Sequence, residues 1–213
     1  PEAGGKPVAL THFEEGETAH RWPQLLPGGT AVLYTASAGN PRAPESSTVV
    51  FTLGNHKRKV LQRGSAYARY VPTYGTNGHI LFMNNGALYA VPFDPQTLEM
   101  PGEPVKVLDG VAYGQSAADF SFTEGAASIG TFVYRKGGAS AENSSTLQWF
   151  DSKGQTRTLL GKPDAYRWPS VAPGGDRVAF STTDVWAYDP RRDTTTRVSF
   201  DSGQMSVWTP DGQ

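Results

Sequence analysis

"HRWPQLLPGGTAVLYTA", residues 20–36, recurs in outline as "YRWPSVAPGGDRVAFST", residues 166–182. Both stretches contain Arg-Trp-Pro, three further residues, Pro-Gly-Gly and then a run of strand-forming residues, and they lie 146 positions apart. Gly is favoured in a tight turn because it adopts a positive φ at little cost. We interpret each stretch as an innermost strand, a Pro-Gly-Gly turn and a second strand, and the recurrence predicts a repeat.

Turn signals recur at a similar spacing along the rest of the chain. The glycines that mark them are Gly28, Gly78, Gly125, Gly174 and Gly212, at intervals of 50, 47, 49 and 38 residues. This spacing is close to the length of a propeller blade, which is roughly 40 to 50 residues. Between the turns the sequence predicts short strands, so that each unit contains four of them.

The composition favours the same fold class. The chain of 213 residues has 24 Gly and 16 Pro without a collagen-like period, and no stretch of eleven residues keeps a helical apolar stripe. Frequent turn residues between short apolar runs are typical of an all-β protein. We therefore predict an all-β fold, a β-propeller with about four complete four-stranded blades.

Two segments resemble the repeats of a known family. "APGGDRVAFSTTDVWAYDPRRDTTTRVSF" (residues 172–200) and "VWTPDG" (207–212) are similar to the Pro-Asp-Gly repeats of TolB-like, WD-like β-propellers. In this chain Gly28-Gly29 and Gly174-Gly175 replace Asp-Gly, so the turn is retained but the hydrogen bonds of the Asp side chain are not. The resemblance implies a fold and only weakly an activity, because such propellers serve as scaffolds, sensors and occasional enzyme frames.

A narrower resemblance concerns the propeller that follows the catalytic domain of many bacterial serine/threonine protein kinases. It is carried by "GGKPVALTHFEEGETAHRWPQLLPGG" (residues 4–29), "GALYAVPFDPQTLEMPGEPVKVLDGVA" (86–112) and "FVYRKGGASAENSSTLQWFDSKGQ" (132–155). The chain itself has no His-Arg-Asp, no Asp-Phe-Gly and no kinase Gly-rich loop with its lysine. The resemblance implies a kinase-associated sensor segment rather than a kinase.

The repeat places the blades at approximately residues 20–65, 66–112, 113–163 and 164–202 of a single propeller domain, residues 1–213. We also expect lone end strands at residues 7–13 and 204–210. The two ends either form a hybrid fifth blade, or leave an open ring that copies of the chain complete as a homo-oligomer. Unpaired strand edges favour such pairing between chains.

Charge and composition exclude some partners and leave the compartment open. The formal net charge is −1, which gives no reason to expect nucleic acid as a partner, and no apolar run has the roughly 18 residues of a membrane span. Cysteine is absent, so thiolate chemistry is excluded but the redox compartment is not indicated. Because the chain starts at Pro1 and stops at "TPDGQ", we expect a segment of a longer bacterial protein, extracytoplasmic or cytoplasmic.

Candidate site residues lie near the starts of the innermost strands, which line the channel of a propeller. Those expected to bind a ligand are basic or aromatic: Arg21, Arg69, Arg167, Tyr67 and Tyr166. Guanidinium groups bind carboxylates and phosphates bidentately, so we expect a small anionic ligand, or a protein or peptide, at the channel mouth. Alternatively, the arginines stack on aromatic side chains or pair with Asp119 between blades.

Catalysis has weaker candidates. His20 and Asp119 are the side chains we would test first, and no Gly-x-Ser-x-Gly or His-Glu-x-x-His motif accompanies them. A metal site from His20, Asp119 and Glu124 is the alternative to our expectation of no metal and no cofactor. "FDSKGQT" (residues 150–156) is close to a sialidase Asp-box but one residue too long, and we interpret it as a hairpin turn.

Two functions therefore remain. The first is a non-catalytic propeller module that senses a ligand or binds a protein. The second is a small hydrolase of esters or phosphoesters, with or without a metal, in which His20 or the metal activates water at the channel mouth. We expect most of the five tryptophans to pack between blades in either case.

Overall fold

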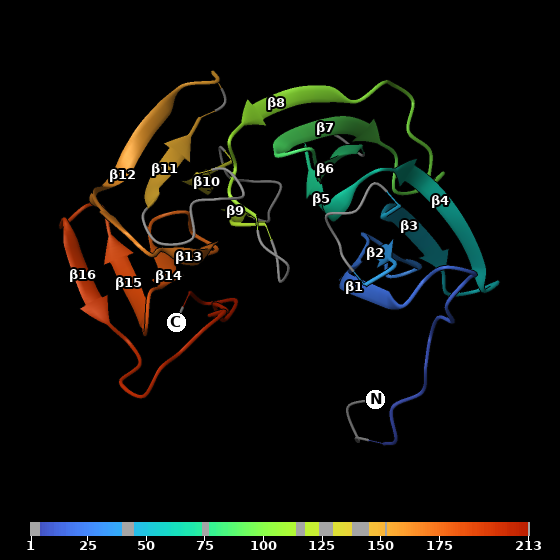
Figure 1. Ribbon diagram of the computed structural model, residues 1–213, viewed down its shortest axis with the longest axis horizontal. Helices are drawn as coiled ribbons and strands as arrows, with labels where there is room; N and C mark the ends of the chain where they lie inside the picture. Colours follow the sequence, from blue (N-terminus) through green and yellow to red (C-terminus); the bar gives the residue numbers. More distant parts are fainter. Residues whose placement is uncertain are drawn as a thin grey trace. The chain divides into compact units, whose positions relative to one another are not determined.

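A computed structural model of the chain describes residues 5–39, 45–73, 77–113, 118–123, 130–137, 145–151 and 153–212. Sixteen β-strands make up the regular structure of these described ranges (Figure 1). Within the described ranges, no helix combines the length and the hydropathy needed to span a membrane. The all-β prediction is confirmed.

The strands form four sheets of four, each with its strands in chain order. Blade 1 contains β1 (Ala19–Leu25), β2 (Ala31–Ser37), β3 (Ser47–Thr52) and β4 (Lys57–Arg63). Blade 2 contains β5 (Ala66–Pro72), β6 (Gly78–Asn84), β7 (Ala87–Phe93) and β8 (Val105–Asp109). Blade 3 contains β9 (Phe120–Phe122), β10 (Phe132–Lys136), β11 (Ser145–Phe150) and β12 (Thr156–Asp164). Blade 4 contains β13 (Arg167–Val171), β14 (Val178–Ser181), β15 (Val185–Asp189) and β16 (Thr194–Arg197).

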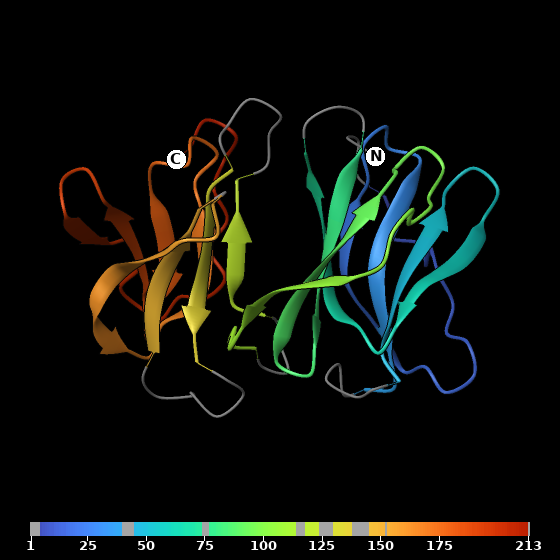
Figure 2. The same cartoon turned by 90° about the horizontal axis from the view of Figure 1, so that it is seen from above.

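A sheet of four strands in chain order is the unit of a β-propeller, so the predicted fold class is confirmed. The chain divides into two compact units, Pro1–Arg69 and Tyr70–Gln213. The first holds blade 1 and the second holds blades 3 and 4. In the second unit β13 contacts both β9 and β10, so that blades 3 and 4 lie side by side (Figures 1 and 2). A single domain over residues 1–213 and the closure of the ring stay predictions.

The first strand of a blade is bulged at each of the two Arg-Trp-Pro motifs. The β1–β2 register shifts between Arg21 and Gln24, and the β13–β14 register shifts between Arg167 and Ser170. In each bulge the Trp before the Pro has a positive φ, 53° at position 22 and 47° at position 168. Pro has no backbone N–H to donate to the ladder, so in strands it occurs at edges and bulges. The bulge therefore accounts for the presence of the motif in both blades.

The Pro-Gly-Gly turns form as predicted. The amide of Gly29 donates to the carbonyl of Leu26, and the amide of Gly175 donates in the same way to Ala172. Gly28, Gly29 and Gly175 have φ values of 85°, 66° and 70°. The turn requires a left-handed backbone conformation, which glycine adopts most easily. The turn can therefore form with Gly-Gly in place of Asp-Gly.

One core cluster of the second unit lies between blades 3 and 4. Val133 and Leu147 of blade 3 are fully buried in one cluster with Val178 and Phe180 of blade 4. Trp149 and Trp186 pack against this cluster, as predicted for tryptophans between sheets. Blade 1 has its own cluster of Tyr34, Ala36, Val49 and Phe51. These cores fix the positions of the turns at the ends of the blades.

The predicted end strands are wrong in detail, because neither residues 7–13 nor residues 204–210 form a strand. Side-chain contacts hold these segments instead of a ladder. Thr11 and Phe13 contact His20, and the indole N–H of Trp208 donates to the Ser170 carbonyl at 3.0 Å. The last strand, β16, ends at Arg197, after which the amides of residues 198 and 199 both donate to the Val185 carbonyl.

Candidate functional site

His20 is the centre of a polar cluster on blade 1. Oγ1 of Thr11 lies 2.8 Å from Nδ1 of His20, and Nε2 of His20 donates to the carboxylate of Glu17 at 3.0 Å. The imidazole also packs against Phe13 and Tyr34, with ring centroids 5.0 and 4.6 Å away. The structure therefore gives this candidate base both a hydroxyl neighbour and a carboxylate that orients its ring.

The carboxylate of Glu17 is held from several sides. Burial raises its pKa, but hydrogen bonds from the Glu14 amide and His20, together with the charge of Arg58, outweigh burial and lower the pKa overall. Arg58 pairs with Glu17 and donates through Nε to the hydroxyl of Tyr34 at 3.3 Å. Burial of Tyr34 raises the pKa of its phenol, against the effect of Arg58. Glu17 is thus an ionised anchor at neutral pH.

The other predicted residues of the first unit lie on β1 and β5. Arg21 is half-buried on β1, and within the described residues its Nε is enclosed without a hydrogen-bond partner. The rings of Tyr67 and Trp22 meet edge-on, with their centroids 5.1 Å apart. Arg69 is half-buried and interacts with other residues. The alternative that these arginines stack on aromatic side chains stays a prediction.

Asp119 is buried and serves the fold in the second unit. Its Oδ2 accepts hydrogen bonds from Nε and Nη2 of Arg135 at 2.9 and 2.6 Å, and its Oδ1 accepts from the backbone amide of Trp168 at 2.9 Å. The bulge at Trp168 frees this amide from the β13–β14 ladder. Asp119 therefore links blade 3 to blade 4, and its partner is Arg135 rather than one of the three predicted arginines.

Tyr166 and Arg167 stand at the start of blade 4. Tyr166 is buried, donates its hydroxyl hydrogen to the Lys162 carbonyl at 2.8 Å and meets Phe180 edge-on at 5.1 Å. Burial raises the pKa of its phenol. Arg167 is half-buried and interacts with other residues. A common ligand site for the seven predicted residues stays a prediction, since they belong to two separate units.

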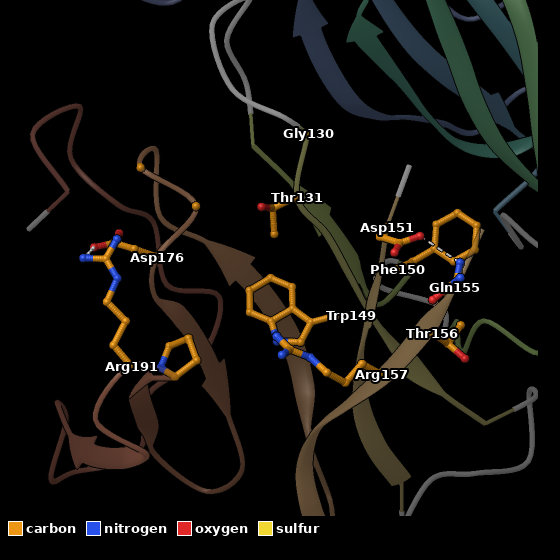
Figure 3. A pocket seen from close by; sticks show the side chains of 13 residues that line it. Gly130, Thr131, Trp149, Phe150, Asp151, Gln155, Thr156, Arg157, Asp176 and Arg191 are labelled. Atoms are coloured by element: carbon orange, nitrogen blue, oxygen red, sulfur yellow. Dashed lines mark hydrogen bonds and ion pairs between the residues drawn. The ribbon is translucent and has the colours of Figure 1, made fainter. Parts of the chain in front are cut away.

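A pocket of about 660 Å³ lies at one end of blades 3 and 4 (Figure 3). It is lined by residues 130–131, 149–151, 155–157, 174–176 and 190–191. These residues belong to the β11–β12 hairpin, the two positions before β10, and the β13–β14 and β15–β16 turns. Its volume lies within the range of small-molecule sites, approximately 300 to 1,000 Å³. None of the seven residues predicted from the sequence lines it.

One wall of the pocket is the hairpin predicted from "FDSKGQT". Oδ1 of Asp151 accepts hydrogen bonds from the amides of Lys153 and Gln155 at 2.9 and 2.8 Å, and Gly154 has a φ of 77°. The turn aligns Trp149 of β11 with Arg157 of β12 as directly paired residues. Paired residues in an antiparallel ladder project to the same face, so both side chains reach the pocket.

The opposite wall belongs to blade 4. Arg191 approaches Asp176 at 4.0 Å, and both lie across the pocket from the hairpin in Figure 3. A Cβ on Gly175 would meet Oγ1 of Thr131 at 3.1 Å, so this glycine allows the β13–β14 turn to approach blade 3 closely. The β13–β14 turn of blade 4 thus forms this side of the pocket.

Arg157 is the most available charged group in the pocket. Its side chain is exposed, and in the described part of the chain neither a hydrogen bond nor an ion pair holds it, although its charge lowers the pKa of Tyr188 against the larger effect of burial. Trp149 beside it offers a flat apolar ring. The pair can bind a ligand that combines polar groups with an apolar face.

Sequence reasoning missed this pocket because it assigned Trp149 to the core and the hairpin to a turn. Both assignments are correct, but the same residues also line the pocket. The available signal was the run of polar residues around a Trp in a hairpin, "WFDSKGQTR" (residues 149–157). The wall that blade 4 contributes could not be predicted from the sequence. Its residues lie some 20 to 40 positions after this segment.

No group of three metal-ligating side chains occurs among the described residues. Of the alternative metal set, Glu124 lies outside the described residues, while His20 and Asp119 are engaged as described above. The expectation of no metal and no cofactor stays a prediction.

The sequence matches no protein-family model and no curated protein. Solved structures with a similar fold include TolB from Acinetobacter baumannii, with 14% identity over 92% of this chain and 47% of that one, at a TM-score of 0.58. A puromycin-hydrolysing peptidase from Mycobacterium tuberculosis has 11% identity over 89% of this chain and 30% of that one, at a TM-score of 0.58. An oligogalacturonate lyase from Vibrio parahaemolyticus has 8% identity over 97% of this chain and 60% of that one, at a TM-score of 0.56.

The chain thus spans less than two thirds of each of these three structures. At such identities the similarity concerns the fold alone, and neighbours with quite different activities share it. The chain is a β-propeller that is similar in fold to TolB.

Proposed function

We propose that the chain is a non-catalytic β-propeller module that binds a ligand, and that the pocket between blades 3 and 4 is its binding site. The carrying observation is the exposed Arg157 beside Trp149, at the opening of a pocket of about 660 Å³. Surface loops on a rigid scaffold are where binding groups gather in such folds. The association with a bacterial serine/threonine kinase is part of this proposal and rests on the sequence resemblance.

Two of the residues predicted from the sequence already have hydrogen-bond partners within the protein, which supports the choice of the pocket as the binding site. Asp119 is committed to Arg135 and Trp168, and the Tyr166 hydroxyl is committed to Lys162, so neither is free for a ligand. Pocket residues such as Gln155 and Arg157 are exposed by contrast. A small anionic or peptide ligand at the channel mouth remains the alternative site within the same function.

Amide chemical-shift mapping tests this proposal. A set of short peptides, small carboxylates and neutral disaccharides is added to the ¹⁵N-labelled chain. We expect at least one class to shift amides of residues 149–157 and 174–176 in a saturable way, and Arg157→Ala to weaken that binding. Saturable shifts confined to Arg21, Tyr67 and Arg69 would move the site to the inner strands. A complete lack of saturable shifts would refute the binding module.

The second candidate function is the hydrolase, and the specific observation in its favour is the Thr11–His20–Glu17 chain. A hydroxyl, an imidazole and a carboxylate in hydrogen-bond sequence are the groups that activate an oxygen nucleophile. In this candidate His20 accepts the proton of Thr11, and Glu17 stabilises the imidazolium that results.

A panel of chromogenic esters and phosphoesters separates the two functions, measured with and without chelator. If the module is non-catalytic, the chain and its Thr11→Val and His20→Gln variants all remain at the background rate. Turnover by the parent chain that both variants lose would establish the hydrolase instead. Turnover that both variants retain would indicate a contaminant, and the module would stand.

A further inference from the structure

We infer that the pocket between blades 3 and 4 binds a neutral, hydroxyl-rich ligand, namely a short saccharide, with a sugar ring against Trp149. This inference deepens the proposed binding function and depends on it. It names a ligand class different from the anionic ligand expected at the inner strands.

The first support is a rigid aromatic surface. Trp149 packs against the buried cluster between blades 3 and 4, which fixes its ring, and its pairing with Arg157 directs it to the pocket. The neighbouring Phe150 meets Phe132 edge-on with ring centroids 6.2 Å apart. A large apolar face held in place loses little conformational entropy when a flat ligand stacks on it. The C–H face of a pyranose is such a partner.

The second support is the balance of charge at the rim. Among the described residues that line the pocket, the ionised side chains are two arginines, Arg157 and Arg191, and two aspartates, Asp151 and Asp176. A site for a phosphate or a polycarboxylate gathers positive charge, because burying a carboxylate near an anion costs free energy. This pocket presents both signs on its two walls, with Asp176 near Arg191. The balance favours an uncharged ligand.

The third support is the mixture of donors and acceptors. A sugar hydroxyl both donates and accepts, so it is best matched by groups of both kinds around one ring. Thr131 offers a hydroxyl and Gln155 an amide, while Asp151 retains Oδ2 as an acceptor beyond its turn hydrogen bonds. Donors and acceptors therefore lie together around the Trp149 ring, which is the arrangement that a saccharide requires.

The experiment is a titration of the whole chain with neutral disaccharides: cellobiose, maltose, xylobiose and N,N′-diacetylchitobiose. Digalacturonate and a mixture of tripeptides serve as comparison probes. Binding is followed by saturation-transfer NMR on the sugars and by tryptophan fluorescence of the protein. We expect one or more neutral disaccharides to bind, and Trp149→Ala to weaken that binding by about tenfold or more, the size of one lost stacking contact.

Controls separate a lost site from a lost fold. Because Trp149 also packs in the core, Trp149→Phe and the exposed Gln155→Ala are tested beside it. The phenyl ring is expected to preserve part of the affinity, and the amide deletion to weaken it severalfold with an unchanged thermal midpoint. Trp208→Ala removes a tryptophan at a separate hollow of about 430 Å³ on the other face of blade 4, and should leave sugar binding unchanged.

Each result decides the inference. Binding of digalacturonate or of tripeptides at residues 149–157, without any neutral sugar, overturns the saccharide and leaves the binding module intact. Sugar binding that Trp149→Ala and Gln155→Ala both retain overturns the pocket. If none of the probes binds at its solubility limit, both the saccharide and the proposed binding site fail.

Discussion

At the scale of single residues, the clearest case is Asp119, which the sequence marks as a possible catalytic group and the fold uses as a link between blades. Its two carboxylate oxygens accept three hydrogen bonds, two from Arg135 and one from the Trp168 amide. Both members of the ion pair are buried, with side-chain exposures of 9% for Arg135 and 6% for Asp119. Removal of one partner leaves a buried charge without its counterion, which is costly.

We therefore expect Asp119→Ala to lower the free energy of unfolding by about 3 to 5 kcal/mol, measured by urea denaturation of the second unit. The matched control is Asp109→Ala, which breaks the exposed ion pair with Lys106 and should leave the urea midpoint unchanged. A loss in Asp119→Ala no larger than in the control would show that the link between blades 3 and 4 lies elsewhere.

Glu17 gives a prediction about pH on blade 1. Its folded-state pKa is lowered from the ordinary value of 4.5, because hydrogen bonds from the Glu14 amide and His20 and the charge of Arg58 outweigh burial. A carboxylate with a depressed pKa stabilises the fold above its unfolded pKa, and this stability is lost as pH falls through the folded pKa.

The urea midpoint of blade 1 should accordingly fall as the pH is lowered below about 4.5, the ordinary carboxyl pKa. Glu17→Gln should be less stable than the parent at pH 7, and its midpoint should change less over this pH range. Tryptophan fluorescence, which includes Trp22, follows the transition. Parallel pH curves for the parent and the variant would contradict the anchor described for Glu17.

At the scale of elements, one turn glycine has a role that its position in the sequence does not reveal. Gly78 is predicted to mark a turn, but it is the first residue of β6, where a larger side chain has no space. A Cβ there would lie 2.5 Å from the Val71 carbonyl oxygen and 2.5 Å from the Tyr70 ring. A backbone oxygen cannot move aside as a side chain can.

Gly78→Ala should thus lower the free energy of unfolding by about 1 to 3 kcal/mol, as overpacking does. Gly54→Ala is the matched control, because its added Cβ would meet nothing within 4 Å and its backbone is not in the left-handed region. Thermal denaturation of both variants beside the parent measures the difference. Equal midpoints for the two variants would refute the steric role.

The elements also show how far the sequence predicts this fold. Turn glycines and short strands repeat along the sequence, so the four four-stranded blades follow from it. The bulge at Arg-Trp-Pro does not follow, because the positive φ at Trp168 depends on an acceptor from another blade, Asp119. The pocket at Trp149 escapes prediction for the same reason, since its second wall belongs to the next blade. Local patterns predict elements, whereas sites built from two blades require the packing.

At the scale of the whole molecule, the two compact units contain separate cores. Val49 is fully buried in the cluster of blade 1, and Val178 is fully buried in the cluster between blades 3 and 4. Repeat proteins gain most of their stability from each unit and its nearest neighbours, so a cavity in one core need not weaken a distant one. The units should therefore respond separately to matched core substitutions.

We expect Val49→Ala to lower the free energy of local unfolding by roughly 2 kcal/mol in strands β2 to β4 while protection in β14 and β15 stays unchanged, and Val178→Ala to do the reverse. Native-state hydrogen exchange read by mass spectrometry resolves the two sets of amides in a single experiment. If each variant instead lowered protection equally in both units, residues 1–213 would unfold as one cooperative domain, as the continuous repeat in the sequence predicts.

The same measurement on the sugar-bound chain adds a second test. A ligand in the pocket stabilises only the state that binds it, so added protection should appear in blades 3 and 4 and be absent from blade 1.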